Sequence, residues 1–175
     1  ATSSSLYETR LGYEKFAKEV HAYSVAFSPE EITQIKPYAD KVIFNSVSQL
    51  KMFYNQLKGR QLGLRINPQI SYSPFKLADP ARRFSRLGVS DKKSLAKAAG
   101  LIQGAMFHFN CENADFKNFS RNLDKIATDY GKFLKTLEWV SLGGGSYFTK
   151  SGYPVEKFSQ KIKKFSEQFN VQVYL

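Results

Sequence analysis

The sequence is poor in the residues that build disulfides, metal clusters and membrane spans. Cys111 is the single cysteine, and His21 and His108 are the two histidines. An internal disulfide and a Cys/His zinc cluster are therefore excluded, and we expect no metal site. No uninterrupted apolar run approaches the roughly 20 residues of a membrane helix, and no signal peptide pattern opens the chain. We expect a soluble, cytoplasmic protein without a membrane partner.

The chain has enough apolar residues to build one core. It has 175 residues, of which 42% are hydrophobic and 15% aromatic, as expected of one folded domain. The net charge of +11 is typical of a protein with an anionic partner. However, the lysines alternate with apolar residues at helical spacing, as Lys157 and Lys161 do with Phe158 and Ile162, which indicates a solvated helix face. We therefore expect no nucleic-acid partner.

Short apolar runs alternate with helical patterns along the chain. The expected strands are residues 20–25, 42–45, 62–66, 105–109, 139–142 and 171–175. The expected helices begin at Ser28-Pro29-Glu30-Glu31, which is a capping box with proline at the first helical position, and cover 48–57, 116–133 and 155–169. This alternation predicts an α/β fold with a parallel sheet.

Two α/β architectures fit this alternation, an open doubly wound sheet and a (β/α)8 barrel. About six strands are visible where a barrel requires eight, so a barrel implies missing sequence. The chain closes on the apolar run 171–175 with nothing after it, which is typical of a segment cut from a longer chain. Residues 67–89 carry three prolines and no clear period, and we expect them to form a lid or a substrate wall.

Polar residues follow the expected strands, where parallel α/β folds place their sites. They are Asn45, Arg65, His108, Asn110 to Asn113, and the glycine triplet 143–145. Glycine permits positive φ and close approach of backbone N–H groups to a ligand, so the triplet suits a phosphate cradle, although any tight strand exit could use it. Arg65 could instead be a structural ion-pair partner, His108 a core histidine, and Cys111 a thiol nucleophile beside His108.

Several motifs, in this order, resemble the carboxynorspermidine decarboxylases of the fold-type III pyridoxal-phosphate decarboxylases. They are residues 2–8 (TSSSLYE), 21–25 (HAYSV), 43–46 (IFNS), 62–68 (LGLRINP), 85–89 (SRLGV), 106–113 (MFHFNCEN) and 139–145 (WVSLGGG). The resemblance covers essentially the whole chain. It implies that residues 1–175 are the central portion of a (β/α)8 barrel domain that binds pyridoxal 5'-phosphate, paired with a β domain in a homodimer with shared active sites.

The same resemblance implies roles for particular residues. His108 is expected to stack on the cofactor ring, and Gly143, Gly144 and Gly145 to donate N–H groups to its phosphate. Cys111 stands where relatives often carry a phosphate-contacting serine, and Arg65 is expected to line the cofactor site. Glu112 and Asn113 are expected to approach the substrate, with Glu112 as a second catalytic candidate beside His108.

The sequence also departs from the family pattern. The Schiff-base lysine would precede Ala1, the Glu-Pro-Gly segment that pairs with the pyridine nitrogen would follow Leu175, and Ser146 stands where many members have histidine. We therefore expect an incomplete segment of an enzyme that decarboxylates carboxynorspermidine or carboxyspermidine to norspermidine or spermidine in polyamine biosynthesis. The alternatives are another fold-type III member, such as diaminopimelate decarboxylase, and a non-enzymatic basic anion-binding module.

Overall fold

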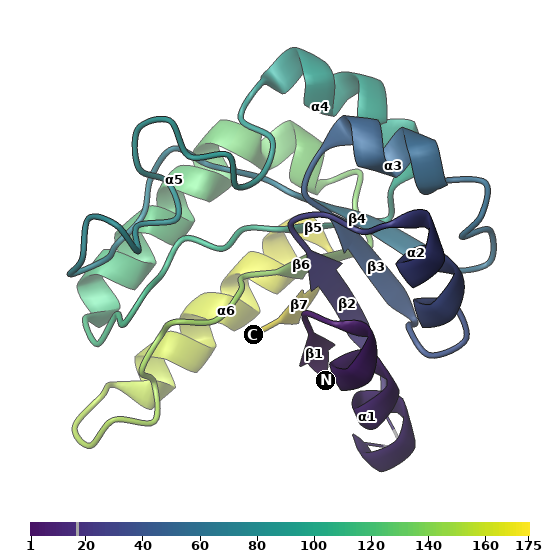
Figure 1. Ribbon diagram of the computed structural model, residues 1–175. Helices are drawn as coiled ribbons and strands as arrows, with labels where there is room; N and C mark the ends of the chain where they lie inside the picture. Colours follow the sequence, from purple (N-terminus) through teal and green to yellow (C-terminus); the bar gives the residue numbers. More distant parts are fainter. Residues whose placement is uncertain (17) are drawn as a thin grey trace.

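The computed structural model describes residues 1–16 and 18–175 and shows one parallel sheet with helices along it (Figure 1). The sheet has seven strands in the order β1 to β7, all parallel. The strands are β1 (Thr2–Ser3), β2 (His21–Ser24), β3 (Lys41–Phe44), β4 (Gln61–Arg65), β5 (Gly104–Met106), β6 (Trp139–Ser141) and β7 (Gln172–Tyr174). The six strands expected from sequence are confirmed, four of them with shorter bounds and two (β3 and β4) shifted by one residue, and β1 was missed.

Helices connect consecutive strands. They are α1 (Leu6–Phe16), α2 (Pro29–Ile35), α3 (Val47–Phe53), α4 (Lys92–Ala98) with the 3-10 turn η1 (Ala99–Leu101), α5 (Phe116–Leu134) and α6 (Val155–Phe169). The capping box of α2 is confirmed, because Glu31 N donates to Ser28 Oγ and Ser28 N donates to the Glu31 carboxylate. No helix within the described residues is long and apolar enough to cross a membrane.

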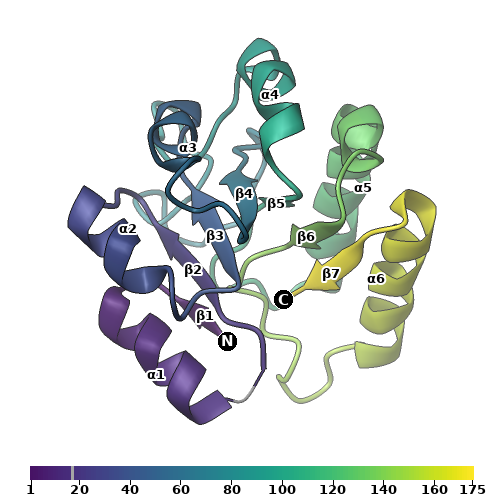
Figure 2. The same ribbon diagram turned by 90° about the vertical axis from the view of Figure 1, so that its right-hand side faces the viewer.

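The strand order decides between the two architectures left open by the sequence. In a doubly wound sheet the order reverses and helices cover both faces, whereas here each strand pairs with the next one along the chain. Right-handed crossovers then place the helices on a single face. Figure 2 shows the strands curling with the helices around the outside. The fold is therefore a curled half-barrel, as the (β/α)8 prediction required.

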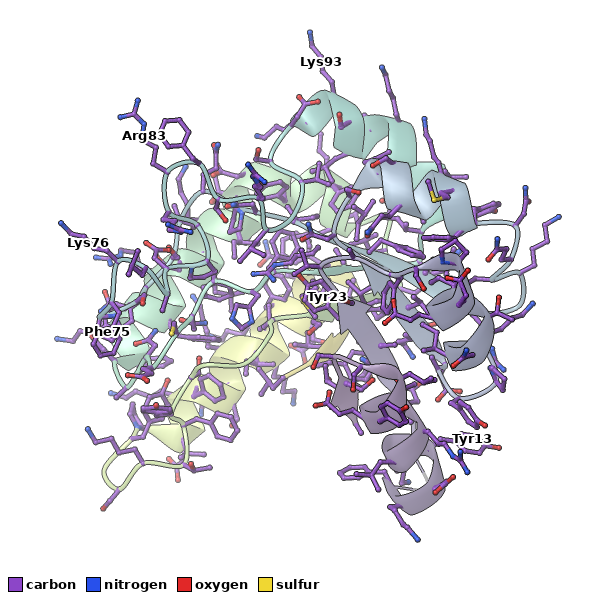
Figure 3. The ribbon with its side chains drawn as sticks, in the orientation of Figure 1. Tyr13, Tyr23, Phe75, Lys76, Arg83 and Lys93 are labelled. Atoms are coloured by element: carbon purple, nitrogen blue, oxygen red, sulfur yellow. The ribbon has the colours of Figure 1, made fainter. Side chains whose placement is uncertain are left out.

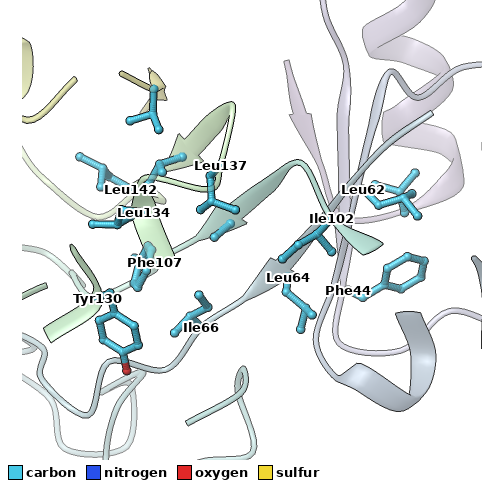
Figure 4. Close-up of a cluster of buried hydrophobic side chains, with 14 of the residues drawn as sticks. Phe44, Leu62, Leu64, Ile66, Ile102, Phe107, Tyr130, Leu134, Leu137 and Leu142 are labelled. Carbon is cyan, nitrogen blue, oxygen red and sulfur yellow. The ribbon is translucent and has the colours of Figure 1, made fainter. Parts of the chain in front are cut away.

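The outer face of the sheet holds the main apolar core. Side chains alternate between faces along each strand, and Phe44, Leu64, Phe107 and Leu142 on the outer side pack beneath the helices (Figure 4). A separate cluster on the inner face consists of Ile43, Met106 and Trp139, with Tyr23 and Tyr174 packed against it. Burial on both faces explains why the strand sequences are nearly continuous apolar runs.

An ion pair between buried Lys41 and half-exposed Glu19 lies on the inner face, at the amino ends of the strands. Lys41 is 3% exposed, and its Nζ lies 2.7 Å from a Glu19 carboxylate oxygen and 5.2 Å from the centre of the Tyr174 ring. The Tyr174 hydroxyl donates to the other oxygen of Glu19 at 2.6 Å. The bonds from Lys41 and Tyr174 lower the pKa of Glu19 to about 2. This cluster joins residues near β2 to the last strand of the sheet.

Candidate functional site at the carboxyl ends of the strands

The glycine triplet follows β6 and turns sharply through two of its three positions. Gly143 and Gly145 have φ of 67° and 84°, in the left-handed region that disfavours side chains. Gly144 lies outside that region, is exposed, and has no atom within 4 Å of a built Cβ. The left-handed conformation that favours glycine is therefore required at Gly143 and Gly145 and not at Gly144.

The loop presents a row of free backbone donors. Among the described residues, the N–H groups of Gly144, Gly145 and Ser146 have no hydrogen-bond acceptor, whereas Tyr147 N donates to Asn113 O at 2.8 Å. Successive unpaired N–H groups in a tight loop form a concave anion-binding surface. The geometry fits the phosphate cradle predicted from sequence.

His108 lies directly beside this loop. It follows β5 by two residues, is partly buried, and a Cβ built on Gly143 would lie 2.5 Å from its Nδ1 atom. Burial, followed by repulsion from the Arg65 guanidinium, lowers the pKa of His108 to about 4. The imidazole is therefore neutral at pH 7, and a neutral flat ring is suited to stacking on an aromatic ligand.

Arg65 ends β4 and is a buried cation. It is 6% exposed, its Nη1 donates to the Tyr23 hydroxyl at 2.6 Å, and its guanidinium lies 5.3 Å from the centre of the Tyr23 ring. Figure 3 shows Tyr23 in the middle of the molecule, on β2. Within the described residues, Arg65 forms no ion pair with Asp or Glu. A structural ion pair is therefore not the reason for its burial, and its charge is available to an anion.

Asn113 lies beneath the glycine loop. It is 1% exposed, its Nδ2 donates to Asn110 Oδ1 at 2.8 Å, and its backbone N donates to Gly145 O at 2.7 Å. The backbone N of Asp115 donates a hydrogen bond to Asn113 Oδ1 at 2.9 Å. The expected substrate contact by Asn113 stays a prediction, and these bonds favour a role in holding the loop.

Glu112 and Cys111 lie at the same rim of the sheet, which is formed by the carboxyl ends of the strands. Glu112 is exposed with φ of 50°, a backbone conformation that costs energy in a residue other than glycine and is concentrated at functional sites. Cys111 is partly buried beside Gly145, and its N–H donates to Tyr72 O. In the described part of the chain, the Cys111 thiol forms no hydrogen bond with His108, so the geometry gives no support to a thiol nucleophile.

The loop 67–89 borders this rim. Tyr72 pairs with Asn110 as a parallel bridge, and Val89 pairs with Ile66 at the end of β4. The tip of the loop carries Phe75, Lys76 and Arg83, which project outward (Figure 3). This position fits the predicted substrate wall.

Sequence reasoning missed one residue of the rim, Tyr23, and assigned no role to a second, Asn45. Tyr23 binds Arg65, and Asn45 binds both Tyr23 and the returning end of the loop 67–89. Asn45 was noted at a strand end without a role, and Tyr23 resembled an ordinary strand aromatic. A signal for Tyr23 was present, because a buried arginine needs a neighbouring acceptor.

The fold is an α/β half-barrel of the (β/α)8 kind. At the carboxyl ends of its strands, the described residues include one buried cation without an ion-pair partner and three backbone N–H groups without an acceptor. No protein-family model matches the chain. It is nevertheless 48% identical over 174 residues, 99% of its length, to a carboxynorspermidine/carboxyspermidine decarboxylase from Herminiimonas arsenicoxydans, of which it covers 48%. It is also 35% identical over 170 residues, 96% of its length, to a carboxyaminopropylagmatine decarboxylase from Synechocystis sp., of which it covers 44%.

A solved structure gives the same likeness. The carboxynorspermidine decarboxylase of Campylobacter jejuni, crystallised with norspermidine, matches 99% of this chain at a TM-score of 0.84 and 34% identity, and this chain covers 44% of it. The resemblance predicted from the sequence motifs is confirmed. The chain spans about half the length of the curated relatives it matches.

Proposed function

We propose that residues 1–175 are the cofactor-binding half-barrel domain of a decarboxylase that converts carboxynorspermidine or carboxyspermidine to norspermidine or spermidine in polyamine biosynthesis. The observation that carries the proposal is the 48% identity over 174 residues to a curated decarboxylase of that name, in an alignment that runs across the whole rim. The names of the relatives favour this substrate class over diaminopimelate. The rim geometry supports an anionic ligand.

The residues present fit pyridoxal 5'-phosphate. The free N–H groups of Gly144, Gly145 and Ser146 would bind the phosphate, and neutral His108 beside them would pack on the ring. Arg65, which pairs with no carboxylate among the residues that the structure describes, supplies a cation for a further anionic group. When bound, the cofactor supplies an electron sink for the charge that loss of carbon dioxide leaves on the substrate.

The remaining rim residues would bind the substrate and hold the glycine loop in place. Glu112 is an exposed carboxylate of the kind that attracts the amino groups of a polyamine, and Asn113 holds the glycine loop in place. Cys111 lies against Gly145, where its side chain would approach the phosphate. The loop 67–89 would wall the site.

The Schiff-base lysine is proposed to lie outside these residues. Lys41 is buried, but it sits at the amino end of β3 in an ion pair with Glu19, at the opposite end of the strands from His108. The resemblance also favours a cytoplasmic homodimer with shared active sites, and the single cysteine suits a reducing compartment.

Expression of the complete protein that carries this chain tests the proposal. We expect it to bind pyridoxal 5'-phosphate and to release carbon dioxide from carboxynorspermidine or carboxyspermidine much faster than from meso-diaminopimelate. Borohydride reduction followed by peptide mapping should label a lysine outside residues 1–175. A protein that binds no cofactor would support the basic anion-binding module instead, and a label on Lys41 would overturn the placement of the catalytic lysine.

A further inference from the structure

The Asn45 side chain connects three segments that are distant in sequence. It follows β3 and is 9% exposed. Its Nδ2 donates to Arg86 O at 3.0 Å, and its Oδ1 accepts from Gly88 N at 2.8 Å and from the Tyr23 hydroxyl at 3.3 Å. A single amide therefore holds β2 and the returning end of the loop 67–89 together.

The directions of these bonds form one consistent chain. Arginine only donates, so the Tyr23 oxygen must accept from Arg65 and send its own proton to Asn45 Oδ1. That choice fixes the amide, with its nitrogen toward Arg86 O. An aspartate at position 45 would keep both acceptor bonds but lose the donor, and it would place a negative charge near Arg65.

The segment fixed by Asn45 also lies close to the stem of Arg65. Gly88 has φ of 84°, and a Cβ built on it would lie 3.0 Å from both Arg65 Cγ and Arg65 O. Arg65 therefore has neighbours on two sides, because Tyr23 accepts a hydrogen bond from its guanidinium and Gly88 lies close to its stem. Asn45 binds both of these residues.

We propose that Asn45 is a positioning residue that, through Tyr23 and Gly88, holds the Arg65 guanidinium for a phosphate or carboxylate anion at the rim. The inference rests on the proposed function, because the anion belongs either to pyridoxal 5'-phosphate or to the substrate carboxylate. Fixing a buried cation in advance removes the cost of ordering it when the ligand binds.

A double-mutant cycle in the complete protein tests this role. The variants are Asn45→Ala, Arg65→Met and the pair, with the affinity of the apoprotein for pyridoxal 5'-phosphate measured by equilibrium dialysis and the KM for substrate measured on the loaded enzyme. Asn45→Ala should weaken anion binding about tenfold, the effect of roughly 1.4 kcal/mol. If Asn45 acts through Arg65, it should cause no further loss once Arg65 is Met.

The two readouts distinguish the sources of the anion. A loss confined to cofactor affinity assigns Arg65 to the cofactor, and a loss confined to KM assigns it to the substrate carboxylate. Additive losses in both readouts would overturn the positioning role while leaving the proposed function intact. A wild-type protein that neither binds the cofactor nor decarboxylates the substrate would remove the proposed function and this inference with it.

Matched variants separate positioning from damage to the fold. Tyr23→Phe keeps the ring beside the guanidinium and removes only the hydroxyl. It replaces Asn45→Ala in the double-mutant cycle if Asn45→Ala does not fold. Asn45→Asp should weaken anion binding at least as much as Asn45→Ala, because its carboxylate offsets the positive charge of Arg65. Asn55→Ala, at an exposed position in the turn after α3, is the control and should bind as wild type does. Wild-type affinity in both Tyr23→Phe and Asn45→Asp would contradict the proposal.

Discussion

The indole ring of Trp139 lies against the backbone of Gly104 in the neighbouring strand, so closely that a Cβ on Gly104 would overlap the ring. Gly63 is paired with Gly104 in the next strand, and a Cβ there would lie 2.5 Å from Cη2 of the same indole. Two adjacent glycines thus form a flat floor for Trp139, which is 1% exposed. Both glycines are required by the packing of the inner face.

Gly104→Ala should destabilise the protein strongly, because neither the sheet backbone nor the buried ring can move aside. Overpacking of this kind costs about 2 to 3 kcal/mol. Urea unfolding followed by circular dichroism measures the cost. Gly100→Ala, which meets no atom within 4 Å, is the control and should change stability little. Adding Trp139→Leu to Gly104→Ala should cost less than the sum of the single changes, and simple additivity would contradict the overlap.

The glycine loop should respond differently at each of its positions. Gly143→Ala and Gly145→Ala force a side chain into the left-handed region at about 1 to 2 kcal/mol each, and they also press on His108 and on the Asn110 carbonyl. Gly144→Ala should leave the unfolding midpoint unchanged. If Gly144→Ala nevertheless weakens binding of pyridoxal 5'-phosphate, the loss reports crowding of the bound anion. An equal loss of stability at all three glycines would contradict the geometry.

His108 should make the protein less stable as the pH falls from about 6.5 to about 4. Its folded pKa of about 4 lies below the ordinary histidine value of 6.5, so between these two pH values the unfolded chain binds a proton that the native protein does not. The stabilisation is present above pH 6.5 and is lost as the pH falls to about 4. Urea midpoints of wild type and His108→Asn, compared across this range, measure it, and the variant should show a shallower decline. His21, whose pKa is also lowered, serves as the comparison in His21→Asn.

Arg65→Met should raise the pKa of His108, because the guanidinium is the second cause of its depression after burial. Proton NMR of the imidazole, assigned with His21→Asn, follows the titration. The apparent pKa should move upward toward its usual range without reaching it, because burial remains. A midpoint that stays at the wild-type value would place Arg65 too far from His108 for a shared ligand.

The ion pair of Glu19 and Lys41 should stabilise the half-barrel at the amino ends of its strands. Glu19→Gln leaves a buried ammonium without its counter-charge and should cost about 2 to 3 kcal/mol, less than for a fully buried pair because Glu19 is half exposed. Combining it with Lys41→Met should recover most of that loss. In the wild type, the contribution of Glu19 is full above its ordinary pKa of 4.5 and disappears as the pH falls toward 2. Thermal unfolding of wild type, Glu19→Gln and the double variant at pH 7 and pH 3 checks both statements.

Local sequence rules predicted most of the fold. The capping box at Ser28, the apolar runs of six strands and the helical spacing in α5 and α6 each reflect interactions within a few residues of one another. Strand β1 was missed because Thr2–Ser3 is short and polar. Helices α1 and α4 were missed because Leu6–Phe16 and Lys92–Ala98 each contain only two buried residues. The strand order could not be read from the sequence alone, because both architectures use the same alternation.

The grouping of the candidate residues at one end of the sheet could be predicted from the sequence, but their hydrogen bonds could not. Strand ends of a parallel sheet meet at one rim, so Arg65, His108 and the glycines could be grouped before the structure was known. The hydrogen bonds of Tyr23 and Asn45 depend on register between β2, β3 and β4 and on the path of the loop 67–89. The contrast between Gly144 and its neighbours depends on individual φ values, which no composition rule supplies.

The hydrogen bond between Tyr174 and Glu19 has a consequence for the order in which the protein assembles. Each strand pairs with its successor, so the sheet can grow by closing modest loops one after another, whereas this bond joins residues 155 positions apart. The entropy of closing so long a loop is lost before the contact contributes anything. The Tyr174 contact therefore belongs to the last stage of folding, and it is the place where the curled sheet first opens when the protein unfolds.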